Sequence, residues 1–359
     1  MELCEQVLNL ARWAPSGDNT QPWRFELLSD HEILVHGFDT RAHCVYDLDG
    51  WASQLAHGAL LENITLAATR FGRRAHISVV SEYPDGRADY RVVLEPDASV
   101  TEDGRVACMR ERVVQRRPMR TAPLSARARA ALERSAAPYS VIWLDSWTSR
   151  WRMALLCARN AHIRLTIPEA YAVHKAVIAW NSKTSEDRLP DASLGANAML
   201  LGIMRWAMAN WGRVHFMNRY AGGTMMPRLL MDFAPGLLCS AHFALVASRE
   251  PLETSDRLDA GRAVQRFWLS ATALGLQIQP AYTPLVFARY ARAGILFTKV
   301  EKAQATAAEI ARRLDDLLGP AQALRTIFMG RIGPARPVKG RSIRLPLERL
   351  IVREAPKSL

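Results

Sequence analysis

An internal repeat restricts the fold of this chain more than any other feature of its sequence. Residues 58–72 and 261–275 align without a gap, have the apolar spacing of a helix, and both begin and end with glycine. The other identical pairs are Leu66 with Leu269, Ala68 with Ala271 and Thr69 with Thr272. Two amphipathic helices can match by chance, but the order helix, Ala-Pro, strand also occurs twice, at residues 14–15 and 137–138. We therefore expect an internal duplication.

The run from Arg12 to Phe25 places turn-forming and polar residues between an expected helix and an expected strand. Pro15 ends the helix, because proline lacks a backbone N–H and clashes with the preceding turn. Residues 16–19, Ser-Gly-Asp-Asn, form a turn whose side chains can bond to nearby backbone or to a ligand. Residues 23–27 then alternate apolar and polar side chains, as a half-buried strand does. The run is either a plain helix–turn–strand connection or a binding loop.

Three arginines, Arg116, Arg117 and Arg120, lie within one stretch of five residues. We expect a charged helix that begins near Thr101 and ends at Pro118, which would leave the guanidinium groups on a turn. Guanidinium groups on a turn suit bidentate binding of phosphate. A basic turn exposed to solvent is the alternative interpretation.

The run Pro-Ser-Gly-Asp-Asn-x-Gln-Pro-Trp-x-Phe, which begins at Pro15, resembles the loop that nitroreductase-like, FMN-dependent oxidoreductases place against the flavin. The resemblance implies that this loop contacts the cofactor FMN. The implied contact residues are Pro15, Ser16, Gly17, Asn19 and Gln21. The family also binds the FMN phosphate with an Arg-Arg-Ser-x-Arg-like run, which assigns Arg116, Arg117 and Arg120 to the phosphate. Pro118 replaces the usual serine here, so one hydroxyl contact is lost.

Two later segments are similar to the same family. The segment after the second repeat would cross the flavin ring, which makes Gln277, Gln279 and Pro280 candidate ring contacts. Near the C-terminus, Lys339 and Arg341 resemble the family's Lys-x-Arg, which is followed by Pro-Leu-Glu and returns basic side chains to the phosphate.

The family is a dimer with its flavin at the subunit interface. In this chain the first copy has the Ser-Gly-Asp-Asn loop without an arginine-rich turn, and the second copy has the turn without the loop. We therefore expect an α+β, nitroreductase-like fold of two tandem degenerate copies, with antiparallel-rich sheets flanked by helices, that forms a pseudo-dimer around one FMN site. The expected halves are 1–98 and 99–359, with a helical lid inserted at about 146–236, and a monomer is favoured.

The formal charge of +12 and pI near 9.9 suit nucleic acid, an anionic membrane surface or an acidic ligand. Basic residues are spread along the chain, and no zinc-finger or RNA-recognition motif is present, so we expect no nucleic-acid partner. The most apolar stretch, residues 194–211, contains an arginine and two asparagines, so we expect no membrane partner. Five scattered cysteines argue against disulfides and structural zinc, and without an evident signal peptide a cytoplasmic location fits best.

Four functional hypotheses follow. The first is an FMN-dependent oxidoreductase that passes hydride through the flavin to a small-molecule acceptor, with NAD(P)H as a candidate donor. No catalytic side chain is assigned, because the flavin supplies the reactivity. The second is a flavin-sequestering or storage protein whose lid prevents turnover. The third is redox tailoring of a peptide or cofactor precursor beside an adenylating partner enzyme, and the fourth is a basic scaffold without a cofactor.

Overall fold

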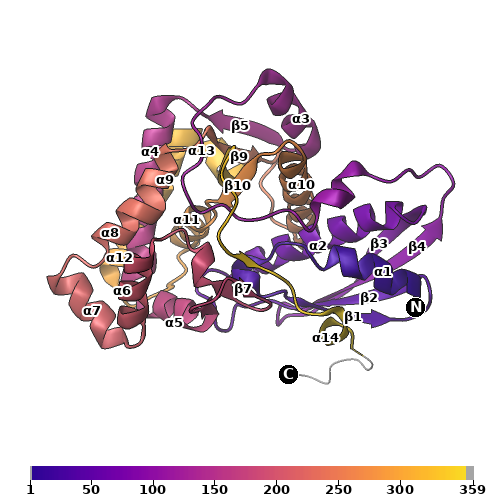
Figure 1. Ribbon diagram of the computed structural model, residues 1–359, viewed down its shortest axis with the longest axis horizontal. Helices are drawn as coiled ribbons and strands as arrows, with labels where there is room; N and C mark the ends of the chain where they lie inside the picture. Colours follow the sequence, from indigo (N-terminus) through magenta and orange to yellow (C-terminus); the bar gives the residue numbers. More distant parts are fainter. Residues whose placement is uncertain (1, 353–359) are drawn as a thin grey trace.

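The structure, a computed structural model, describes residues 2–352 and has an α+β fold in which two antiparallel sheets are flanked by helices (Figure 1). The first sheet contains β1 (Trp23–Leu27), β2 (Glu32–Gly37), β4 (Ala88–Pro96) and β3 (Arg73–Glu82), in that order. Alternate residues of its strands, such as Ile33 and Val35, are buried. They pack against α1 (Glu2–Ala11) and α2 (Trp51–Thr69) in the first core. The period of two in these strands therefore positions one apolar face under the helices.

The second sheet contains β10 (Gln277–Pro280), β11 (Thr326–Gly333), β9 (Ala241–Val246) and β5 (Ser140–Leu144), in that order. Its two central strands are wholly buried, because helices cover both faces. The helices on one face are α3 (Ala126–Ala136) and α10 (Thr254–Ala273), and those on the other are α4 (Trp147–Thr166), α11 (Thr283–Ala293), α12 (Glu301–Leu318) and α13 (Pro320–Arg325). Phe243 points to the first group and Ala244 to the second. Burial on both faces explains the continuous apolar run at residues 243–247.

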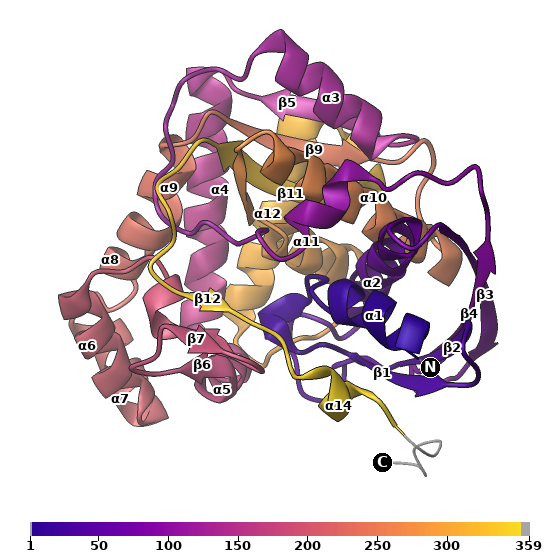
Figure 2. The same cartoon turned by 45° about the vertical axis from the view of Figure 1, so that its right-hand side comes forward.

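The two sheets have the same connectivity. In chain order, β1, β2, β3 and β4 correspond to β5, β9, β10 and β11, and both sheets have the spatial order first, second, fourth, third. In each, one helix follows the second strand and leads into the third, α2 in the first sheet and α10 in the second. These two helices pack against each other at the centre of the molecule (Figure 2).

Helices α2 and α10 cross at Gly58 and Gly261, the glycines that begin the two repeats. A Cβ atom on Gly58 would overlap the carbonyl oxygen of Leu258, and a Cβ atom on Gly261 would overlap that of Leu55. The contact is reciprocal, since each glycine faces the residue three positions before the other glycine. Glycine is needed at both positions because the two backbones approach too closely for a side chain.

Residues 178–237, which we call the lid segment, connect the core helices of the second sheet to β9. This segment contains β6 (Ile178–Ala179), β7 (Thr184–Ser185), β8 (Leu189–Pro190), η3 (Asp191–Ser193), α6 (Ala198–Met208), α7 (Trp211–Tyr220), α8 (Met225–Pro227), η4 (Arg228–Phe233) and α9 (Ala234–Leu237). The expected lid also included α4 and α5 (Pro168–Val177), but both helices pack into the core of the second sheet through residues such as Met153 and Val173. No described helix is both long and apolar enough to span a bilayer.

The C-terminal part of the chain returns across the lid segment to the first sheet (Figure 1). β12 (Arg341–Ser342) pairs in parallel with β7, and α14 (Leu347–Leu350) contacts α1 and β1. The backbone N–H of Val352 donates a hydrogen bond to the carbonyl of Phe25 (2.8 Å). The end of the described chain is thereby tied to the strand that follows the opening loop.

The helix expected from Thr101 to the arginine run is wrong. Only a short 3₁₀ helix, η2 (Gly104–Cys108), forms within it. Val114 instead makes a β-bridge with Ile278, and the backbone N–H of Gln115 donates to the carbonyl of Ile278 (3.0 Å). Pairing with the edge strand β10 thus overrides the helical spacing of the apolar residues.

Candidate functional site

A cavity of about 460 Å³ lies where the opening loop, α2, the second sheet and the lid segment meet. Small-molecule sites typically have volumes of about 300–1,000 Å³. Leu55, Ala56 and Ala59 of α2 form an apolar part of the wall, together with Trp268 and Phe328. Other lining residues come from both ends of the chain, so folding is what assembles this site.

The opening loop has a strained backbone beside the cavity. Asp18, Asn19 and Gln21 have φ values of 49°, 64° and 48°, in the left-handed region that residues other than glycine rarely adopt. Ser16 Oγ accepts a hydrogen bond from the backbone N–H of Gln21 (2.9 Å), which fixes the turn. Such strain persists only where surrounding contacts hold it, and it is concentrated at functional sites.

The side chains of Asn19 and Gln21 attach this loop to the lid segment and to the C-terminal stretch. Asn19 Nδ2 donates to the carbonyls of Glu186 (2.9 Å) and Ile343 (3.2 Å). Asn19 Oδ1 is buried and has no hydrogen-bond partner among the described residues. Gln21 donates to the carbonyl of Glu186 (2.8 Å) and accepts from the backbone N–H of Leu345 (2.9 Å). Gln21 therefore joins the opening loop to the lid segment and the C-terminal stretch, and it lies outside the cavity lining.

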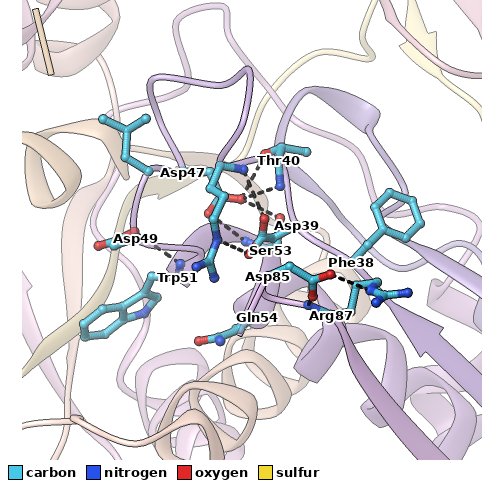
Figure 3. A network of polar contacts seen from close by, with 12 residues as sticks. Phe38, Asp39, Thr40, Asp47, Asp49, Trp51, Ser53, Gln54, Asp85 and Arg87 are labelled. Atoms are coloured by element: carbon cyan, nitrogen blue, oxygen red, sulfur yellow. Dashed lines mark hydrogen bonds and ion pairs between the residues drawn. The ribbon is translucent and has the colours of Figure 1, made fainter. Parts of the chain in front are cut away.

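The loop that precedes α2 is fixed by the buried carboxylate of Asp47 (Figure 3). Asp47 Oδ2 accepts hydrogen bonds from the backbone N–H of Thr40 (3.2 Å), the hydroxyl of Thr40 (2.9 Å) and the hydroxyl of Ser53 (2.6 Å). Its Oδ1 accepts from the backbone N–H of Ser53 (3.2 Å). Burial raises the pKa of this carboxyl group, although the four hydrogen bonds oppose the shift. The network sets the position of the first turns of α2, which carry Ala52 and Leu55 to the cavity.

Six arginine side chains line the cavity, and only two of them were predicted. The predicted ones are Arg116 and Arg341, and the others are Arg112, Arg164, Arg331 and Arg344. Among residues 2–352, only two carboxylates, Asp18 and Asp232, line it beside them. This excess of guanidinium groups suits an anionic ligand, because a cavity walled by low-dielectric protein strengthens the attraction.

Arg331, on β11, holds the arginine-rich turn in place. Its Nη2 donates to the backbone carbonyls of Gln115, Arg116 and Arg117 at 3.2, 2.9 and 3.0 Å. Its Nε donates to Gln279 Oε1 (2.7 Å), and its Nη1 is buried without a hydrogen-bond partner in the described chain. Burial lowers the pKa of Arg331 to about 10. Carbonyl dipoles, rather than a carboxylate, therefore hold this buried cation.

Arg112 and Arg344 are two further buried cations, next to the opening loop. Arg112 Nη2 donates to the carbonyl of Trp13 (3.2 Å), and Arg344 donates to the carbonyl of Ala14 through Nε (3.0 Å) and Nη2 (2.9 Å). Burial lowers the pKa of Arg112 to about 9 and the pKa of Arg344 well below its ordinary value, and neighbouring arginines add to both shifts. An anionic ligand would offset this repulsion between like charges.

Arg164 differs from these cations because it is paired with a carboxylate. Its Nη2 lies 2.6 Å from Asp232 Oδ1. Burial raises the pKa of Asp232, and the charge of Arg164 opposes that shift. Burial also raises the pKa of Asp18, against the attraction of Arg116 and Arg164. Burial thus raises the pKa of both carboxyl groups of the lining above that of an exposed carboxyl group.

Neutral ring groups at the wall can hold or pass a proton. Tyr46 OH and His174 Nε2 share a hydrogen bond of 2.9 Å, and burial together with Arg164 lowers the pKa of His174 to about 3. His242 Nε2 donates to the carbonyl of Gly236 (2.7 Å), so its Nδ1, which is buried without a partner among the described residues, is an acceptor. Burial lowers the pKa of His242 to about 4. Both imidazoles are therefore neutral near pH 7.

Eight of the predicted cofactor-binding residues lie at the cavity wall. They are Pro15, Ser16, Gly17, Asn19, Arg116, Gln279, Pro280 and Arg341. The remaining predicted residues, Gln21, Arg117, Arg120, Gln277 and Lys339, lie outside the lining. Arg120 and Lys339 are exposed, and Gln277 Oε1 accepts a hydrogen bond from Gln115 Nε2 (2.7 Å). Arg116 is thus the one member of the arginine run that lines the cavity.

Within residues 2–352, no group of three or more His, Cys, Asp or Glu side chains could hold a metal ion, and the five cysteines are free thiols. Comparison with known proteins finds no family model that matches the chain and no significantly similar curated protein. The functional interpretation therefore depends on the chemistry of the cavity.

Proposed function

We propose that this chain is an FMN-binding oxidoreductase of the nitroreductase type and that the cavity is its flavin site. The observation that carries the proposal is the meeting of the strained opening loop with Arg116 at one cavity lined by an excess of guanidinium groups. Both segments resemble flavin-binding sequences, and the fold brings them together at this cavity. Their convergence supports the proposal, because FMN needs both a loop that contacts its ring and cations that bind its phosphate.

The lining residues fit the parts of FMN. Arg116 would hold the phosphate dianion, for which a guanidinium group is well suited, and Arg112 and Arg341 would keep the surrounding wall positive. Asn19 Oδ1 would accept a hydrogen bond from a ring N–H group. A buried polar atom without a partner costs about 1–3 kcal/mol, so such a ligand would recover that free energy. The apolar wall that includes Leu55 would face the flat ring.

Bound flavin would accept two electrons as hydride and pass them to an acceptor. The residues of the chain would bind and orient it, and they would exclude water. Met204, Pro227 and Met231 of the lid segment line the cavity and would shield the ring from solvent. The hydrogen-bonded pair Tyr46 and His174 would hold a proton at the wall. NAD(P)H is the proposed donor and a small molecule the proposed acceptor.

We further infer that the site is assembled by two degenerate nitroreductase-like copies in a pseudo-dimeric arrangement. The equal strand order of the two sheets and the reciprocal contacts of Gly58 and Gly261 support this origin. The glycines that end the repeats, Gly72 and Gly275, also share a positive φ, 61° and 70°. In this arrangement the first copy contributes the opening loop and the second contributes Arg116.

Flavin sequestration is the second candidate, because the lid segment forms part of the wall. Anaerobic titration with NADPH, followed by dithionite, distinguishes the two functions. An oxidoreductase bleaches the flavin bands with NADPH at a rate that supports turnover and recovers them on addition of a quinone. Bands that persist with NADPH and bleach only with dithionite would favour sequestration over the oxidoreductase.

A further inference from the structure

Part of the lid segment exposes apolar side chains on successive helices. We call residues 198–230, which comprise α6, α7, α8 and the start of η4, the exposed hairpin. Figures 1 and 2 both show α6 and α7 at a corner of the molecule, away from the two sheets. On α6, Met199, Ile203 and Trp206 are 74%, 43% and 53% exposed, and their spacing places them on one face of the helix.

The exposed surface continues beyond α6. No residue of α7 is buried, and Phe216 and Tyr220, one turn apart, are 57% and 69% exposed. The following exposed apolar residues are Met225, Met226, Leu229 and Leu230. Proteins rarely leave large apolar patches uncovered unless these bind something. The exposed hairpin is therefore a candidate binding surface.

The charge of the exposed hairpin indicates what it binds. The chain has no Asp or Glu between Asp191 and Asp232, although this stretch contains four arginines. The guanidinium of Arg213 lies 4.8 Å from the centre of the Trp206 ring, and that of Arg219 lies 5.6 Å from the centre of the Tyr220 ring. Basic groups thus lie directly beside exposed aromatic rings, and among the described residues neither Arg213 nor Arg219 forms an ion pair with a carboxylate. Such a surface is complementary to an anionic one.

We propose that the exposed hairpin inserts into the headgroup region of an anionic lipid bilayer. Interfacial helices combine arginines with tryptophan, phenylalanine and aliphatic side chains in this way, and they need no membrane-spanning segment. The expectation of no membrane partner depended on the lack of an apolar stretch that could span a bilayer, and an interfacial surface does not need one.

Two other kinds of binding partner fit the exposed hairpin less well. A nucleic acid would pair with the arginines but would leave aliphatic residues such as Met199 and Leu229 uncovered. A second copy of the chain, in a symmetric contact, would bring two acid-free basic surfaces together. A bilayer offers both a negative surface and an apolar layer beneath it. The proposal does not depend on the bound flavin.

The test is co-sedimentation of the full chain with vesicles of phosphatidylcholine alone and with vesicles that also contain phosphatidylglycerol. The wild-type chain should bind only the phosphatidylglycerol vesicles. Each arginine near an anionic surface contributes about five-fold in affinity, so R213Q/R219Q should bind about 30-fold more weakly. Ile203→Ser with Trp206→Ser should also lose binding, because the apolar insertion is removed.

The matched control is Leu252→Ser with Leu296→Ser, since both leucines are highly exposed but lie outside the exposed hairpin. This variant should bind vesicles like the wild type, and all variants should keep the wild-type melting temperature. Equal binding to both vesicle types, no binding, or unchanged binding by R213Q/R219Q would overturn the proposal. Self-association that is lost in the Ile203 and Trp206 variant, without vesicle binding, would assign the surface to a second copy and would also overturn it.

Discussion

Replacement of Arg116 by alanine tests the phosphate assignment most sharply, because its neighbour Arg117 provides a matched control. Arg116 lines the cavity, whereas the Arg117 side chain lies outside it and makes no hydrogen bond or ion pair in residues 2–352. A hydrogen bond to a charged group contributes about 1.5–3 kcal/mol, so R116A should bind FMN about 10- to 150-fold more weakly. R117A should bind FMN like the wild type.

The assay is titration of FMN and riboflavin by quenching of flavin fluorescence. Riboflavin lacks the phosphate, so its affinity should be lower than that of FMN and nearly equal in R116A and the wild-type chain. An equal loss for both flavins in R116A would mean that the side chain acts through the fold rather than on the phosphate. Equal weakening of FMN binding by R116A and R117A would refute the assignment.

Three further predictions concern the scaffold and can be checked by thermal and urea unfolding. Gly58→Ala should destabilise the chain by about 3 kcal/mol or more, since the new Cβ meets backbone at the α2–α10 crossing, whereas Gly202→Ala on exposed α6 meets nothing and should not. Asp47→Ala should cost about 3 kcal/mol or more, because it leaves buried hydroxyl and N–H donors unpaired, and an unchanged melting temperature would disprove this role. Burial lowers the pKa of both His57 and His242 from 6.5 to about 4. Between pH 6.5 and pH 4 the unfolded chain therefore binds more protons than the folded chain, so the free energy of unfolding should fall as the pH is lowered through this range. Each histidine should account for about 2 kcal/mol at pH 5, so His242→Gln should remove that part of the pH dependence, and an unchanged pH dependence in this variant would contradict the account.

Local sequence patterns predicted much of the fold. The period-two strand at 23–27 and the helix of the first repeat are confirmed, because their burial follows directly from residue spacing. The helix from Thr101 was wrong, because pairing of Val114 with β10 is a tertiary contact that no local pattern encodes. The repeated glycines indicated a special position, but only the fold shows that Gly58 and Gly261 contact each other.

The cavity was predicted less completely than the fold. The opening loop and Arg116 have recognisable local motifs, whereas Arg112, Arg331 and Arg344 belong to no such motif, and only folding brings them together. The sequence offered one signal for Arg331, because it is the one charged residue of the mostly apolar strand β11. Gln21 was predicted to contact the ligand, but its side chain forms hydrogen bonds with backbone groups of two other segments. Residue type alone does not distinguish these two roles.

The identity of the ligand is tested most directly by the flavin content of the chain after incubation with FMN and removal of the excess. The account predicts a yellow protein with resolved flavin absorbance bands that releases one FMN per chain on denaturation, since one pseudo-dimeric site is formed. A colourless protein that retains no FMN would contradict the proposed function, and two FMN per chain would contradict the single shared site.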